Sequence, residues 1–160
     1  MRRYVAVVGP SAASDEQAAA AEELGAALAR RGHVVVCGGG GGVMAAASHG
    51  AAEAGGLVVG LLPGNDRRAA NPHLTVAIPT GLGEMRNALV VRAADAVVAV
   101  GGSWGTLSEV ALAVRTGVPV VAIGGWRVTD GDDEPAGFRR AAGPAEALEV
   151  LDTLFADGGR

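Results

Sequence analysis

Short apolar segments that do not alternate with polar residues are the feature that most limits the fold of this chain. Residues 34–37, 57–62 and 97–100 are apolar throughout, which is typical of strands covered on both faces. Longer segments with helical spacing of apolar residues lie between the strand-like ones. We therefore expect residues 1–160 to form a single α/β domain, a doubly wound Rossmann-like parallel sheet in three α/β/α layers.

The boundaries of the elements follow from glycines, prolines and capping residues. We expect strands at residues 4–8, 33–37, 57–62, 74–78, 94–100 and 118–123, the last being the final strand of the sheet. We expect helices at residues 14–31, 42–54, 84–93, 105–116 and 144–155. Residues 63–73 and 124–137 are rich in Gly, Pro, Asn and Asp, which predicts loops, and we expect the second to be flexible.

Composition excludes several classes of protein. Hydrophobic residues make up 49% of the chain and its formal charge is −4, so neither a disordered chain nor a nucleic-acid partner is expected. No apolar run approaches the roughly 20 residues that span a bilayer, so we expect a cytoplasmic protein without a membrane partner. A single Cys37 and three histidines without metal-ligand spacing predict no metal site.

Two glycine-rich turns follow apolar strands and carry the functional prediction. Residues 101–109 read Gly-Gly-Ser-Trp-Gly-Thr-Leu-Ser-Glu, and residues 38–42 are all glycine. The first amides of a helix lack intrahelical partners and attract phosphate, and glycine lets an anion approach the backbone closely. We therefore expect a small phosphorylated ligand at the carboxyl ends of the strands. The expected binding residues are Gly9, Ser11, Gly38, Gly39, Gly40, Gly41, Gly42, Gly102, Ser103, Trp104, Gly105 and Thr106.

Arg86 and Glu109 are the candidate catalytic residues. Glu109 lies one helical turn beyond Gly105 and Thr106, where a carboxylate can act as a general base or hold a ribose hydroxyl; the alternative is a carboxylate that only complements the helix N-terminus. Arg86 lies in the first turn of its helix, where the dipole disfavours a cation. This position favours an anion partner, either a phosphate or Glu109, over an ordinary surface arginine. Asn87 is a weaker candidate.

Two common nucleotide-binding signatures are absent from the sequence. No acidic residue ends the strand after the five-glycine run, as the dinucleotide fingerprint requires, and no Gly-Lys-Ser or Gly-Lys-Thr forms a P-loop. The chain also contains no lysine, so a pyridoxal Schiff base cannot form. NAD enzymes, P-loop NTPases and lysine decarboxylation are therefore excluded.

The two turns and the Arg86 and Glu109 pair resemble the Lonely Guy family, often labelled lysine decarboxylase-like. Its Pro-Gly-Gly-x-Gly-Thr-x-x-Glu motif corresponds to residues 101–109, and Arg86 matches the arginine of its Met-x-x-Arg-Lys segment. This resemblance implies a phosphoribohydrolase that releases the base of a nucleoside 5′-monophosphate, with Arg86 and Glu109 as the catalytic pair. It also implies a homo-oligomer, a dimer or a tetramer, and no required cofactor.

The chain departs from that pattern at four positions. Gly101 replaces the motif proline, Ser103 a glycine, Asn87 a lysine and Ser108 a glutamate. In these positions the chain looks closer to a small bacterial branch that is similar to molybdenum cofactor carrier proteins, which bind a pterin phosphate. Two hypotheses therefore stand: nucleotide binding with hydrolysis, or non-enzymatic binding of the molybdenum cofactor.

Overall fold

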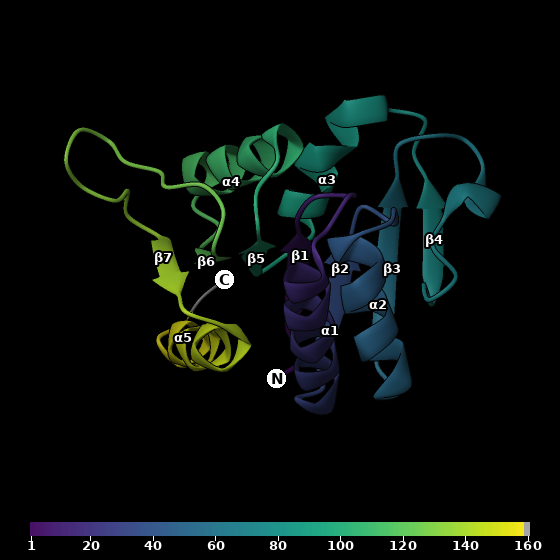
Figure 1. The fold of residues 1–160 in the computed structure, drawn as a ribbon, viewed down its shortest axis with the longest axis horizontal. Helices are drawn as coiled ribbons and strands as arrows, with labels where there is room; N and C mark the ends of the chain where they lie inside the picture. Colours follow the sequence, from purple (N-terminus) through teal and green to yellow (C-terminus); the bar gives the residue numbers. More distant parts are fainter. Residues whose placement is uncertain (159–160) are drawn as a thin grey trace.

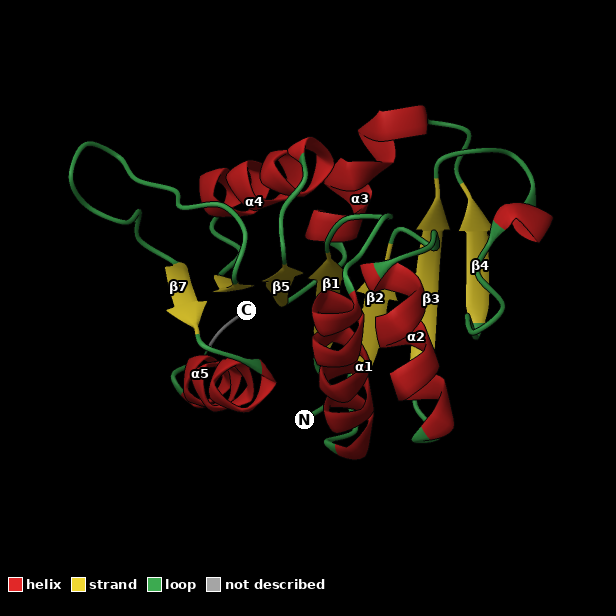
Figure 2. Cartoon of the chain, viewed as in Figure 1, coloured by secondary structure: helices red, strands yellow, loops and turns green. Residues whose placement is uncertain are grey.

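A central sheet of parallel strands organises the chain. The computed structural model describes residues 1–158. The strands are β1 (Tyr4–Val8), β2 (Val34–Cys37), β3 (Leu57–Leu62), β4 (Val76–Pro79), β5 (Ala96–Val100), β6 (Val120–Ile123) and β7 (Phe138–Ala141). They pair in the order β4-β3-β2-β1-β5-β6-β7 (Figures 1 and 2). The order reverses between β1 and β5, and in such sheets a ligand crevice lies beyond the carboxyl ends of the strands at this point.

Helices cover both faces of the sheet and make the fold three-layered (Figure 1). The helices are α1 (Asp15–Arg30), α2 (Val43–Glu53), α3 (Asn87–Arg92), α4 (Trp104–Thr116) and α5 (Pro144–Ala156), with short 3₁₀ turns η1 (Arg67–Ala69) and η2 (Gly83–Arg86). Val5 and Val7 of β1 pack in one hydrophobic core with α1, α2 and α5, whereas Ala6 and Val8 pack in another with α3 and α4. The predicted Rossmann-like α/β class is confirmed.

Local signals in the sequence fix the ends of α1. The Ser14 hydroxyl accepts a hydrogen bond from the Gln17 amide, and the Gln17 side chain accepts one from the Ser14 amide. This reciprocal pair is a capping box, which satisfies two amides that the helix itself leaves without partners. Gly32 follows the last turn with φ of 77°, a left-handed conformation that glycine adopts at little cost. The chain then turns directly into β2.

The structure corrects three of the expected elements. Residues 118–123 are not the final strand, because β7 pairs with β6 at the edge of the sheet. Residues 63–73 are not entirely loop, because they contain the 3₁₀ turn η1. The helix expected over residues 84–93 begins as the 3₁₀ turn η2 and becomes α-helical only at Asn87.

The segment between β6 and β7 contains no regular element apart from a bridge between Asp130 and Asp133. Its expected flexibility stays a prediction.

Within residues 1–158, none of the helices combines the length and the apolar character needed to cross a lipid bilayer.

Candidate functional site

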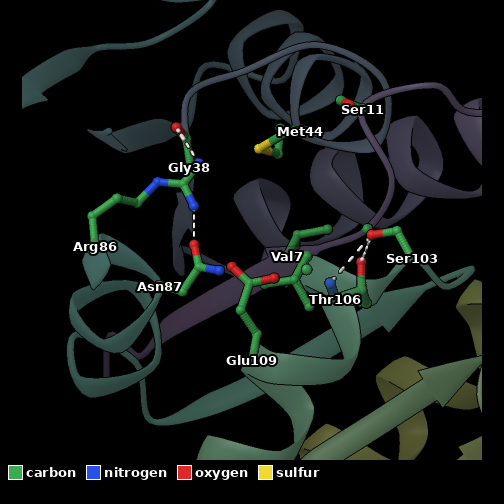
Figure 3. Close-up of a pocket in the computed structure, with 12 residues that line it drawn as sticks. Val7, Ser11, Gly38, Met44, Arg86, Asn87, Ser103, Thr106 and Glu109 are labelled. Carbon is green, nitrogen blue, oxygen red and sulfur yellow. Dashed lines mark hydrogen bonds between the residues drawn. The ribbon is translucent and has the colours of Figure 1, made fainter. Parts of the chain in front are cut away.

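A cavity of about 210 Å³ lies beyond the carboxyl ends of β1 and β2, against the start of α4. Figure 3 shows Arg86 and Asn87 on one side of it, Ser103 and Thr106 on the other, and Glu109 between them. Both predicted catalytic residues line this cavity. Six of the predicted binding residues also line it: Gly9, Ser11, Gly38, Ser103, Gly105 and Thr106. Segments far apart in the sequence therefore meet at one site.

The other predicted binding residues lie outside the wall of this cavity. Gly42 is the N-cap of α2 with φ of 60°, and a Cβ there would come within 2.3 Å of the Pro10 carbonyl oxygen. Gly42 therefore shapes the turn and does not contact the cavity. The same holds for the rest of this group, since none of them lines the cavity: Gly39, Gly40, Gly41, Gly102 and Trp104.

Arg86 is held at the cavity by its neighbours. Its Nη1 donates a hydrogen bond to Asn87 Oδ1, and its Nη2 donates one to the Gly38 carbonyl oxygen at 3.5 Å. A Cβ on Gly38 would lie 2.6 Å from Nη2, so a glycine at this position makes room for the guanidinium. The Arg86 Nε is buried without a hydrogen-bond partner among the described residues. A buried N–H without a partner is costly, and an anion in the cavity beside the guanidinium would offset part of that cost through its charge.

Glu109 is a buried carboxyl group on the second turn of α4. Glu109 is 7% exposed. Burial raises the pKa of its carboxyl group to about 7, although the positive charge of Arg86 lowers that pKa. Burial disfavours the charged form, and Arg86 compensates only in part. Glu109 therefore changes protonation near neutral pH, so it is able to donate or accept a proton within the cavity.

The first turn of α4 leaves amides available for an anion. Ser103 is the N-cap, and its hydroxyl accepts a hydrogen bond from the Thr106 amide at 3.2 Å. The protein itself therefore uses the Thr106 N–H. The amides of Trp104 and Gly105 begin the helix and have no such partner among the described residues. The positive end of the α4 dipole thus faces the same cavity as Arg86.

Three residues of the cavity wall are not predicted from the sequence, namely Val7, Val8 and Met44, and a fourth, Asn87, is only a weaker candidate there. Asn87 donates from Nδ2 to the Ser108 hydroxyl at 3.3 Å and orients Arg86 through its Oδ1. Its place next to Arg86 in the sequence was a signal for it. Val7, Val8 and Met44 carry no chemical signal, because apolar residues in strands and helices are expected in a core.

Comparison with known proteins places the chain in a family. The model of the SLOG cluster4 family matches residues 2–148. The chain belongs to the SLOG cluster4 family. A curated relative is an uncharacterised protein of Archaeoglobus fulgidus, which is 37% identical over 95 residues. That match covers 56% of this chain and 62% of the relative, so the chain spans less than two thirds of that relative's length.

Two solved structures match this SLOG chain over almost its whole length. The molybdenum cofactor binding protein of Rippkaea orientalis is 32% identical, with a TM-score of 0.88, and the match covers 97% of this chain and 98% of that one. The molybdenum cofactor carrier protein of Chlamydomonas reinhardtii is also 32% identical, with a TM-score of 0.86 and coverage of 98% and 99%. These findings agree with the predicted similarity to carrier proteins, whereas the Lonely Guy assignment stays a prediction.

Proposed function

We propose that this protein binds the molybdenum cofactor, a phosphorylated pterin, and carries it without changing it. The observation that carries the proposal is that Arg86 and the first turn of α4 face one cavity in a chain that matches cofactor-binding proteins along 97% of its length. The donors of this cavity suit a phosphate monoester, because a guanidinium and free helix amides both favour an anion.

Each polar residue of the cavity has a role in this proposal. Arg86 and the Gly105 amide, whose residues both line the cavity, hold the phosphate. Glu109, with its pKa of about 7, takes up a proton beside the bound anion, because a second negative charge disfavours its carboxylate. A protonated Glu109 then donates a hydrogen bond to the ligand.

Retention of the cofactor tests this proposal. Cofactor released from a molybdenum enzyme is mixed with the protein without oxygen, and bound molybdenum and pterin are measured after gel filtration. The wild type should retain both in equal amounts. Arg86→Gln should weaken binding roughly 10- to 100-fold, as expected for lost charge-assisted hydrogen bonds. Arg92→Gln is the matched control, because Arg92 is an exposed arginine at the other end of α3, the helix that follows Arg86 directly. A wild type that retains no cofactor would refute the proposal.

A second function is favoured by one observation, the raised pKa of Glu109. A carboxyl group that titrates near neutral pH suits general acid–base catalysis, as hydrolysis of the N-glycosidic bond of a nucleoside 5′-monophosphate would require. Incubation with AMP and measurement of ribose 5-phosphate distinguishes the two functions. Turnover that is lost in Glu109→Gln supports hydrolysis, and AMP or cofactor bound without turnover supports the carrier.

A further inference from the structure

A second cavity of about 400 Å³ adjoins the first at the start of α4. It is lined by Glu84, Met85, Asn87, Trp104, Gly105 and Ser108. Asn87 and Gly105 also line the first cavity. The two cavities therefore share a border, and a ligand longer than a phosphate is able to occupy both.

Gly105 lines both cavities. A Cβ built on Gly105 would have only the Ser103 hydroxyl within 4 Å, at 3.8 Å, so packing within the described residues does not require glycine here. Its backbone is helical, and alanine is the better helix former. The packing of the described residues therefore does not explain why position 105 is glycine. A glycine there leaves the border between the two cavities open to a ligand.

Trp104 forms an exposed aromatic wall at the second cavity. It is 77% exposed, and its ring centroid lies 4.8 Å from that of Trp126. Trp126 is held in place by a hydrogen bond that its Nε1 donates to the Ser103 carbonyl oxygen at 2.8 Å. These are the two tryptophans of a chain with only 3% aromatic residues. Trp104 lines the second cavity and Trp126 packs against it, although Trp104 contributes little to the core.

We propose that the planar ring system of the phosphorylated ligand passes over Gly105 and stacks on Trp104. This inference rests on the proposed function, since it requires the phosphate to lie in the first cavity. The mixed lining fits a heteroaromatic ring, whose faces are apolar and whose edges form hydrogen bonds. Trp104 and Met85 contact the faces. Asn87 and Ser108, which are hydrogen-bonded to each other at 3.3 Å, meet the polar edge.

Binding to variants of the aromatic wall tests the inference. The cofactor affinity of Trp104→Ala should be weaker roughly 10- to 100-fold, the range for loss of one base-stacking aromatic residue. Trp104→Phe keeps an aromatic face and should retain most of the affinity. Gly105→Ala should also bind the cofactor less tightly, because its methyl group lies at the border between the two cavities. Tyr4→Ala is the control, since Tyr4 is an exposed aromatic residue at the start of β1, away from the carboxyl ends of the strands.

Two further measurements separate the possible outcomes. In the wild type, stacking should quench tryptophan fluorescence as the cofactor is added. Inorganic phosphate has no ring, so it should protect the wild type and Trp104→Ala equally against thermal unfolding. If the wild type binds the cofactor and Trp104→Ala binds it equally well, the stacking inference is wrong and the proposed function stands. If the wild type binds no cofactor, both the stacking inference and the proposed function are refuted.

Sedimentation analysis addresses the other occupant of this surface, a second copy of the chain. Met85 and Trp104 are exposed apolar side chains, and an oligomer would cover them. The stacking inference expects the same sedimentation coefficient for the wild type and Trp104→Ala at equal concentration. A smaller coefficient for Trp104→Ala would assign the surface to a subunit interface and overturn the inference.

Discussion

Glu109 makes the stability of the protein depend on pH. Its folded pKa of about 7 lies above the ordinary value of 4.5. From about pH 4.5 to 7 the unfolded chain releases this proton while the folded chain keeps it, so stability falls as pH rises. Unfolding in urea across pH 4.5–8 should show that Glu109→Gln lacks this decline, which amounts to about 3 kcal/mol for the wild type.

The control for this prediction is Glu23→Gln, which removes an exposed glutamate of α1. Its stability should follow that of the wild type at every pH. A Glu109→Gln variant whose stability declines as steeply as the wild type would show that Glu109 titrates in the folded protein as it does in water.

At the residue scale, the sequence singles out Arg86 and Glu109, and the structure places both on the wall of one cavity. Arg86 and Glu109 stand next to recognisable turns, and a cation in a first helical turn is an unfavourable arrangement that indicates a partner. The contribution of individual glycines is not predictable in this way. Gly38 makes room for Arg86 and Gly42 for the Pro10 carbonyl, but which glycine meets the ligand and which meets the chain depends on contacts between segments far apart in the sequence.

At the scale of the element, the cap of α4 serves both stability and binding. Ser103 and Ser14 each accept an N-cap hydrogen bond, from the Thr106 and Gln17 amides. Ser103→Ala and Ser14→Ala should each lower the free energy of unfolding by about 1 kcal/mol, as measured in urea. Only Ser103→Ala should also weaken cofactor binding, by roughly fivefold for one lost hydrogen bond, because only Ser103 lines the cavity.

Equal cofactor binding by the two serine variants would show that the Ser103 hydroxyl stabilises the helix and does not contact the ligand. Loss of binding in Ser14→Ala would point instead to a general loss of structure, which the urea measurement would reveal independently.

The sequence does not predict two elements, the edge strand β7 and the 3₁₀ turn η2 that precedes α3. The sequence of β7 is Phe-Arg-Arg-Ala, which lacks the apolar run of a central strand. Charged residues are common on edge strands, since they discourage pairing with other chains. The sequence predicts α-helix at η2, because a 3₁₀ turn and an α-helix have similar side-chain patterns over a single turn. By contrast, each central strand is apolar and is followed directly by glycine or proline, so the position of its end follows from the sequence.

At the scale of the whole molecule, β7 links both hydrophobic cores of the sheet. Phe138 belongs to the core on the face that α3 and α4 cover, while Ala141 belongs to the core on the face that α1, α2 and α5 cover. An edge strand is usually the first part of a sheet to open. The side chains of β7 are therefore expected to hold the edge through burial on both faces, because hydrogen bonds join it to one neighbour only, β6.

Replacement of Phe138 by alanine tests this role of β7. Phe138 is 1% exposed, whereas Phe155, the other phenylalanine of the chain, is only partly buried. Phe138→Ala should lower the free energy of unfolding by about 3–5 kcal/mol, as large cavities do, a large share of the roughly 5–15 kcal/mol that stabilises a domain. Phe155→Ala should cost clearly less in the same denaturant titration. Equal losses would mean that the burial of Phe138 in β7 contributes no more to the fold than the partly buried Phe155 of α5.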